Sequence, residues 1–402
     1  MVSPIMPSSL RRYLPHHPAA CYLRIEIIYV ILSVCFVVNP AVTTIGTLLL
    51  SFFANDKRFA PIDVVFLFLF MWLVQSTRSF HLNEPSDWAF NYYHNFSNIG
   101  KKSFIDYIFL TGKEYAWQIE NYIGYLICGK FLPHANFLVA LTYGFTFLSC
   151  YVYWKHSRRS IRTLVASLAL FAFITEVSML SNNLLRQQFA MSMMLYVIVT
   201  KAVHHKINWA LLVIAVFTHS MTALFVPFLF VKTGIRPSWK MLFLSLAGLA
   251  AFAVLFRLAS SFSGIYVLDR LNSSTGYTGT DVMETSAVYP FLGVTLVLYG
   301  KIVILDRCRS TAALSINNLF LLLILLCLAF QSMPLMQVRY FITRFFFMPL
   351  VIPYFFQPSS RLNSPYLLAV TLLFLMRYCS TDNFWLAPMD DLFTRNLFQY
   401  LF

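Results

Sequence analysis

Apolar residues occur in long runs that short polar or charged segments separate, and this pattern repeats through most of the chain. The runs cover 25–38, 41–54, 61–77, 134–154, 163–181, 188–204, 207–218, 222–232, 241–256, 288–305, 315–333, 340–357 and 364–379. A helix needs roughly 20 apolar residues to cross about 30 Å of hydrocarbon. The pattern therefore predicts an all-α polytopic integral membrane protein, with residues 1–402 as a single transmembrane domain.

Two pairs of short runs, 25–38 with 41–54 and 207–218 with 222–232, predict helical hairpins. Basic residues bracket both ends of each pair: Arg24, Lys57 and Arg58 for the first, and Lys201, Lys206, Lys232, Arg236 and Lys240 for the second. Because Lys and Arg concentrate on the cytoplasmic side, we expect each pair to enter and return on that side. The tips, Pro40 and His219-Ser220, would then lie outside. Short re-entrant hairpins included, we expect about 11–14 membrane segments.

Composition agrees with this class. The chain is 59% hydrophobic, 17% aromatic and only 11% charged, with a mean hydropathy of +0.68, which excludes a soluble globular domain. No apolar stretch precedes a small-residue cleavage site near the start, so we do not expect a cleavable signal peptide. The seven cysteines are scattered singly, which favours small core residues over disulfides or metal ligands.

The net charge of +14 follows from the predicted topology. That topology places 18 of the 30 basic residues and 4 of the 16 acidic residues on the cytoplasmic side, and it leaves the outer side balanced. The charge therefore does not indicate a nucleic-acid partner.

Two polar stretches are long enough to form external structure. Residues 78–133 are rich in aromatic side chains and carboxylates, which predicts an external amphipathic segment of interfacial helices. Within it, Asn121 to Leu132 is apolar but too short to span, so we expect an interfacial or re-entrant helix. Aromatic faces also suit the apolar faces of sugar rings. Residues 257–287 are rich in Ser, Thr and Gly and predict a flexible external loop.

Arg186 carries the first functional signal, because a guanidinium between apolar runs needs an anionic partner or a water-filled cavity. On a helix, Asn183, Arg186 and Gln187 share one face and form a donor-rich patch. The alternative is an arginine at a helix end that snorkels to lipid headgroups. His219-Ser220 at a hairpin tip is either a proton acceptor and hydrogen-bond donor to substrate or a polar turn that joins two helices.

Further arginines are expected at the same outer level. Arg78, Arg339 and Arg344 flank other crossings; Arg339 and Arg344 are five residues apart, so we expect one to anchor at the interface and the other to face the bundle interior. Several cations at outer helix ends indicate an anionic headgroup such as a lipid-linked phosphate or diphosphate. Asp87 and Glu120, in the external segment, could deprotonate a hydroxyl.

At this point an ordered set of residues resembles the EpsG family, which is akin to Wzy-type polysaccharide polymerases. The set comprises Asp87-Trp88, Tyr92-Tyr93 and Phe96; Glu120, Tyr122 and Tyr125; Asn183, Arg186-Gln187 and Ala190; His219-Ser220 and Pro227; and Arg339-Tyr340-Phe341, Pro349 and Pro353. The resemblance extends from about Arg78 to Pro353, which is most of the chain.

The resemblance implies a glycosyltransferase-C-like helical bundle in a bacterial inner membrane, with its active site on the periplasmic side. Such enzymes polymerise O-antigen, capsule or exopolysaccharide repeat units by transferring a growing glycan from polyprenyl diphosphate to a hydroxyl of the next lipid-linked unit. The implied partners are that lipid-linked oligosaccharide, membrane lipid and a chain-length regulator. Neither a cofactor nor a metal is expected.

These expectations assign roles to ten residues. Substrate binding falls to Arg78, Asn183, Arg186, Gln187, Ser220, Arg339 and Arg344. We expect Arg186, with Asn183 and Gln187, to hold the donor diphosphate and Arg339 or Arg344 to add a second phosphate contact, because fixed guanidiniums stabilise a developing negative charge. Glu120, Asp87 and His219 are the candidate catalytic bases, in that order.

Other functions fit parts of the same pattern. A flippase or other transporter of lipid-linked oligosaccharides would explain an internal cationic cavity, but the sequence has no two-fold internal repeat. A glycosyltransferase that adds single sugars from a polyprenyl phosphate remains an alternative of the same broad fold. A membrane O-acyltransferase could use His219 but would not need this spread of arginines.

Overall fold

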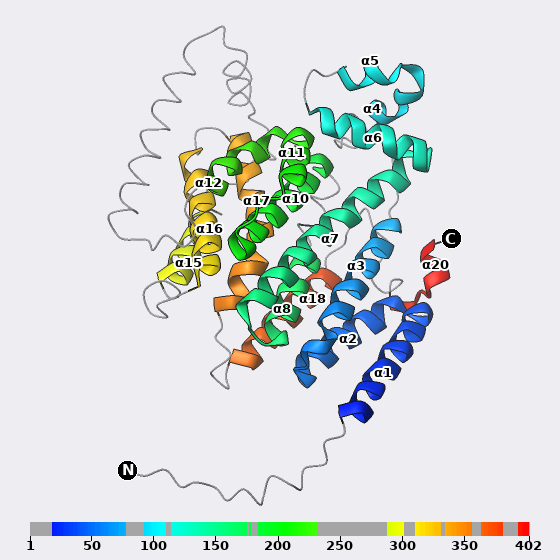
Figure 1. Cartoon of the computed structure of the whole chain (residues 1–402), viewed down its shortest axis with the longest axis vertical. Coiled ribbons are helices and arrows are strands. Elements are labelled where there is room, and N and C mark those ends of the chain that lie inside the picture. Colours follow the sequence, from blue (N-terminus) through cyan, green and yellow to red (C-terminus); the bar gives the residue numbers. More distant parts are fainter. Residues whose placement is uncertain are drawn as a thin grey trace, which may run out of the picture.

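Helices make up all the regular structure in the described part of the chain (Figure 1). The computed structural model describes residues 18–77, 92–109, 114–174, 177, 184–230, 288–300, 310–330, 334–355, 363–380 and 393–401. The predicted class, an all-α polytopic membrane protein, is confirmed. The predicted run 241–256 and the predicted loop 257–287 lie outside the described residues.

The first predicted hairpin is confirmed by α1 (Pro18–Val38) and α2 (Pro40–Ala54). Between them, Asn39 caps α2 by accepting a hydrogen bond from the backbone amide three residues on, at 2.9 Å. Near the other end of the hairpin, the hydroxyl of Tyr29 on α1 donates to the carbonyl oxygen of Arg58, just past α2. The chain therefore returns after α2 to the level of the middle of α1.

Three of the described helical segments are long and apolar enough to cross a membrane. They are Lys57–Ser76, which contains α3 (Ala60–Ser76); Phe131–Ser157, which is α7; and Thr311–Ala329, which is α16. The predicted runs 61–77, 134–154 and 315–333 correspond to these segments.

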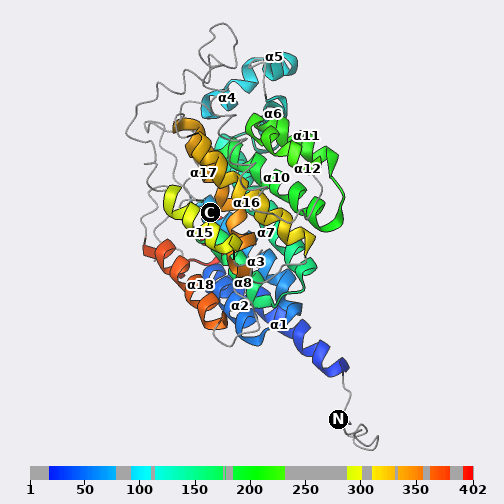
Figure 2. The ribbon, with the colours of Figure 1, turned by 90° about the vertical axis from the view of Figure 1, so that its left-hand side faces the viewer.

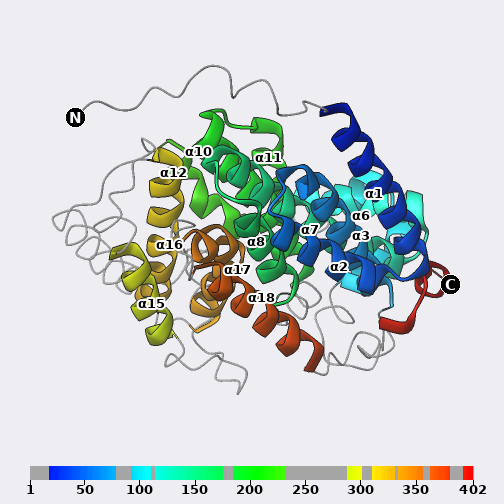
Figure 3. The ribbon, with the colours of Figure 1, turned by 90° about the horizontal axis from the view of Figure 1, so that it is seen from below.

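Helix α7 runs through the middle of the bundle, and the remaining helices pack against it or against its neighbours (Figures 1 and 3). They include α8 (Ile161–Ala172), α10 (Leu185–His204), α15 (Val288–Gly300), α17 (Pro334–Phe355), α18 (Asn363–Ser380) and the C-terminal α20 (Leu397–Leu401). Helix α7 contacts α3 and α10 along its length, and α17 packs against both α8 and α16.

Buried aromatic rings join α7, α8 and α17 at the centre. Phe171 of α8 lies 5.5 Å from Tyr143 and 6.1 Å from Phe147 of α7, and 5.4 Å from Phe346 of α17, between ring centroids. All four side chains are at most 1% exposed. Because each such ring pair contributes about 0.5–1.5 kcal/mol beyond its buried area, this cluster holds the three helices in one arrangement.

Several hydroxyl groups of α2 form hydrogen bonds inside the bundle. On α2, Thr44 donates to the carbonyl of Pro40 and Thr47 donates to that of Thr43, both at 2.7 Å. Ser51 instead donates to the carboxyl of Asp63 on α3 at 2.9 Å, and Asp63 is only 1% exposed. Since an unsatisfied polar group is costly in lipid, these bonds allow a polar stripe inside an apolar bundle.

Three short helices cover one end of the bundle, at the top of Figures 1 and 2: α4 (His94–Ser97), α5 (Phe104–Phe109) and α6 (Tyr115–Cys128). Helix α6 is amphipathic. Leu126 and Ile127 are 68% and 77% exposed on one face, whereas Trp117 and Asn121 are buried on the other. This geometry is typical of an interfacial helix, although its position on the outer leaflet stays a prediction.

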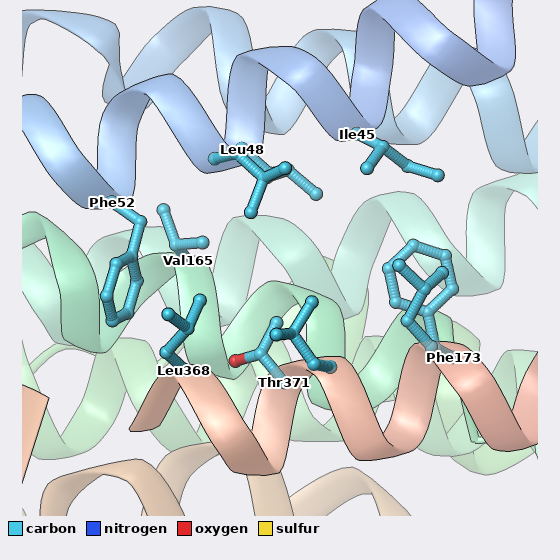
Figure 4. A pocket seen from close by; sticks show the side chains of 10 residues that line it. Ile45, Leu48, Phe52, Val165, Phe173, Leu368 and Thr371 are labelled. Carbon is cyan, nitrogen blue, oxygen red and sulfur yellow. The ribbon is translucent and has the colours of Figure 1, made fainter. Parts of the chain in front are cut away.

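A pocket between α2, α8 and α18 is almost wholly apolar (Figure 4). It is lined by Ile45, Leu48, Leu49, Phe52, Val165, Phe173, Leu368, Thr371, Leu372 and Leu375. The hydroxyl of Thr371 is the polar side-chain group in this lining, so the pocket has no residue suited to acid, base or phosphate chemistry. The candidate site lies elsewhere, where α6 meets the bundle.

Candidate functional site

Arg186 forms an ion pair with Glu114, and this pair joins the bundle to its external helices. Arg186 lies in the first turn of α10, and Glu114 directly precedes α6. The side chains are 32% and 14% exposed, so the pair is partly screened from solvent. An arginine at this position is therefore accounted for by an anionic partner within the protein, in addition to any lipid headgroup it could reach by snorkelling.

The predicted tip at His219-Ser220 is confirmed as a turn between two helical segments, and it faces α6. It lies between α11 (Trp209–Thr218) and the short helix η5 (Ser220–Phe225), which continues into α12 (Val226–Phe230). The backbone N–H of Ser220 donates to Oε1 of Glu114 at 3.4 Å. One turn thus contacts the carboxylate that also pairs with Arg186.

A second carboxyl group, that of Glu120 on α6, meets the same turn. The hydroxyl oxygen of Thr218 lies 2.7 Å from its Oε1 and 2.8 Å from the carbonyl oxygen of Ile214. One hydroxyl hydrogen can serve only one of these acceptors. Thr218 therefore donates to an ionised Glu120, whereas a protonated Glu120 can donate to Thr218, which then donates to Ile214. The site accommodates both protonation states.

Burial sets the proton affinity of Glu120. Its Oε2 is buried and has no hydrogen-bond partner among the described residues. Burial raises the pKa of Glu120 to about 8, and the hydrogen bond from Thr218 acts in the opposite direction. A carboxyl group that changes protonation close to neutral pH is suited to general base chemistry.

His219 is held neutral beside two arginines. The side chain is buried, and its Nδ1 accepts a hydrogen bond from the backbone N–H of Met221 at 3.3 Å. Burial, followed by the charges of Arg186 and Arg339, lowers the pKa of His219 to about 3. A neutral ring with an occupied Nδ1 carries its proton on Nε2, so it is a hydrogen-bond donor. The use of His219 as a base stays a prediction. Because its Nδ1 already accepts a hydrogen bond and its Nε2 carries the proton, Glu120 is the better candidate for that role.

Gln187 links α10 to α17 next to this site. It is 2% exposed, and its Nε2 donates to the carbonyl oxygen of Arg339 at 3.1 Å. This bond brings the start of α17 against the start of α10. Two residues of the predicted donor patch therefore bind different partners. Arg186 pairs with Glu114, whereas the side-chain amide of Gln187 donates to α17.

Arg344 faces the bundle interior, as expected for one of the two arginines on α17. It is 4% exposed, and its Nη1 donates to the carbonyl oxygen of Phe341 at 2.6 Å. Its guanidinium carbon lies 3.2 Å from the ring centroid of Phe341 and 4.2 Å from that of Phe345. These rings stabilise the buried cation. Contact between Arg344 and substrate stays a prediction.

The structure thus brings together Glu120, Arg186, Gln187, His219, Ser220 and Arg339 of the predicted site residues. Arg78, Asp87 and Asn183 lie outside the described residues. Sequence reasoning missed Glu114 and Thr218. Glu114 is one of several carboxylates in the external segment, and nothing in its local sequence separates it from the others. Thr218 ends the apolar run 207–218, so its sequence context is that of a core residue.

Chemically, this site combines two guanidiniums, a neutral imidazole and a carboxyl group with a pKa near neutrality. Cations of this kind can bind phosphate oxygens, and the carboxyl group can accept a proton from a hydroxyl. The arrangement is thus suited to an anionic leaving group on one side and a hydroxyl nucleophile on the other.

Comparison with known proteins defines the family. No curated protein and no solved structure matches this chain. A family match does exist, and it covers residues 62–389, which include every site residue described above. Because this match covers most of the 402 residues, the chain belongs to the EpsG family, which is associated with polysaccharide biosynthesis.

Proposed function

We propose that this protein is a polysaccharide polymerase. In this proposal it joins oligosaccharide repeat units carried on polyprenyl diphosphate, at the periplasmic face of a bacterial inner membrane. The observation that carries the proposal is the placement of Arg186 and Glu120 on two sides of one turn, at Thr218 to Ser220. Membership of the EpsG family supports it.

On the donor side, Arg186 binds the diphosphate of the growing lipid-linked chain. When the bond between the anomeric carbon and the phosphate oxygen breaks, negative charge develops on the diphosphate. A guanidinium already in place stabilises that charge without reorganisation of solvent. Arg339 adds positive charge, since its field reaches His219 together with that of Arg186. Polyprenyl diphosphate leaves as the second product.

On the acceptor side, Glu120 takes the proton from the hydroxyl group that attacks. The oxygen of that hydroxyl forms the new bond to the anomeric carbon, and its proton passes to the carboxylate. The buried Oε2 of Glu120 has no partner among the described residues, which supports its assignment as the proton acceptor. Thr218 stabilises the ionised form that precedes the transfer.

The test is to replace Arg186 with Ala and to examine lipid-linked glycans. We expect loss of polymer by at least 100-fold, because one preorganised charge contact contributes about 2.7–4 kcal/mol to such a transition state. Single lipid-linked repeat units should accumulate on the outer face. The matched control is Arg58→Ala. It removes an arginine that pairs with Asp56 just after the C-terminal end of α2, so it should preserve polymer.

Three other outcomes contradict the proposal. Repeat units trapped on the cytoplasmic face would indicate a flippase. A product ladder spaced by single sugars in the unmodified protein would indicate a transferase that adds monomers. Normal polymer from the Arg186→Ala protein would exclude the assigned role of this residue.

A further inference from the structure

The carboxylate of Glu114 is bound by two donors that would also suit a phosphate group. One of its oxygens pairs with the guanidinium of Arg186, and the other accepts from the backbone N–H of Ser220 at 3.4 Å. These two donors come from α10 and from the turn after α11, and they converge on one anion. A guanidinium and a backbone N–H are also the donors that proteins use for phosphate oxygens.

The backbone at Glu114 shows that tertiary contacts hold this carboxylate in place. Glu114 adopts a left-handed conformation, with φ 53° and ψ 48°, and its side chain does not cap α6. A residue with a Cβ adopts this region only at an energetic cost. Among the described residues, no local hydrogen bond of the side chain offsets that cost. The ion pair with Arg186 and the contact with Ser220 therefore keep Glu114 where it is.

The charges around the site indicate what happens when Glu114 leaves. Arg186 and Arg339 are cationic, His219 is neutral, and Glu120 carries a proton at pH 7. The carboxylate of Glu114 pairs with Arg186 and balances part of this positive charge. Without Glu114, the cluster would attract an external anion more strongly.

We propose that Glu114 is an internal competitor for the diphosphate site and swings away when a lipid-linked diphosphate binds to Arg186. This inference rests on the assignment of Arg186 to the diphosphate and adds a means of regulation to it. Release of Glu114 also frees the start of α6, the helix that carries Glu120. Donor binding is therefore coupled to the position of the base.

The competition has a predictable effect on affinity. When a site is free of its internal ligand only part of the time, the apparent Kd rises in inverse proportion to the free fraction. Loss of a hydrogen-bonded charge pair changes an equilibrium by about tenfold or more. Removal of the charge of Glu114 should therefore lower the Kd for a diphosphate by about tenfold or more.

The first experiment measures binding of inorganic diphosphate to the purified full-length protein by calorimetry at fixed ionic strength. We expect Glu114→Gln to bind at least tenfold more tightly than the unmodified protein. The matched control is Asp106→Asn, which removes an exposed carboxylate of the same external segment that bonds to Ser103; its Kd should stay within about twofold. Equal or weaker binding by the Glu114→Gln protein overturns the proposal.

A second measurement distinguishes displacement of the Glu114 side chain by diphosphate from a general effect of removing its charge. Addition of diphosphate to the unmodified protein should raise amide exchange in the first turn of α6, because that turn loses its anchor to Arg186. The Glu114→Gln protein should show fast exchange there already. Unchanged exchange in the unmodified protein at saturating diphosphate overturns the proposal even if Glu114→Gln binds more tightly.

Arg186→Gln distinguishes the failure of this inference from the failure of the proposed function. If Arg186→Gln weakens binding but Glu114→Gln does not strengthen it, only the competitor role of Glu114 is wrong. If Arg186→Gln leaves binding unchanged, the diphosphate assignment itself fails. Should the Glu114→Gln protein fail to fold, Glu114→Asp tests the competition in another way, because its shorter side chain weakens the ion pair while the charge stays. It should also bind diphosphate more tightly than the unmodified protein, and equal or weaker binding overturns the proposal.

Discussion

Among single residues, Glu120 controls the expected pH dependence of the reaction. A base must be ionised to accept a proton, and burial raises the pKa of Glu120 to about 8. Polymerisation rate should therefore rise with pH and reach half its maximum near pH 8. Thr218→Val removes a hydrogen bond to the ionised form, so it should shift the midpoint upward by about one pH unit.

This shift is measured with lipid-linked repeat units over a pH series in a reconstituted system. Thr200→Val is the matched control, because the hydroxyl of Thr200 bonds to carbonyls of its own helix and lies near the other end of α10. Its profile should match that of the unmodified protein. If Thr218→Val leaves the midpoint unchanged, Glu120 is not the group that titrates.

The same carboxyl group should make stability depend on pH. Its pKa is about 8 in the folded protein against a usual value of 4.5, so the folded chain binds more protons between these values. The free energy of unfolding should therefore fall as pH rises from about 4.5 through 8. Glu120→Gln has no charge to bury, so its melting temperature should exceed that of the unmodified protein at pH 9. A lower melting temperature of Glu120→Gln at pH 9 would contradict the burial argument.

Among the helices, the contact of α6 with α7 determines where the candidate site lies. A Cβ atom added to Gly124 would lie 2.0 Å from Nδ1 of His134, whose Nε2 lies 3.1 Å from Oδ1 of Asn121. Phe96 of α4 stacks on the same imidazole, with 5.3 Å between ring centroids. The absent side chain at Gly124 therefore allows the external helices to pack directly on the bundle.

Gly124→Ala should lower stability by about 1–3 kcal/mol, because the new methyl group overpacks this contact. Thermal unfolding in detergent measures the change. Gly46→Ala is the matched control: a Cβ atom there meets nothing within 4 Å, so the change should be neutral or slightly stabilising. The double variant with His134→Ala should recover part of the loss. Full stability of Gly124→Ala alone would show that α6 and α7 accommodate the methyl group, and it would contradict the close-packing argument.

For the whole molecule, the predicted orientation in the membrane can be tested by labelling. If α4 to α6 lie outside, a single cysteine at Lys101 should react with an impermeant maleimide in intact cells, in a background without the native cysteines. A cysteine at Lys57, beyond α2, should react only after the membrane is opened. The reverse result would place the candidate site on the cytoplasmic side and contradict a periplasmic polymerase.

Most of the element positions were predictable, because a helix in lipid must satisfy its own backbone and present apolar side chains outward. This requirement placed α3, α7 and α16 and the turn at His219-Ser220 within a few residues. The run predicted as 163–181 is an exception, since α8 ends at Ala172. Hydrophobicity alone did not predict that end, because Phe173 and Ile174 are buried as well.

The chemical identity of the site was predictable in part. Arg186, Glu120 and His219 are polar residues in or beside apolar runs, and their cost in lipid marks them without any structure. The partners of Arg186 and Glu120 are different, because Glu114 approaches Arg186 and Thr218 approaches Glu120 from segments that are distant in sequence. Linear order therefore established a membrane bundle with costly polar residues at one end. Helix packing, which brings segments about 70–100 residues apart into hydrogen-bond distance, established that Arg186 faces Glu114 and that Glu120 is buried against Thr218.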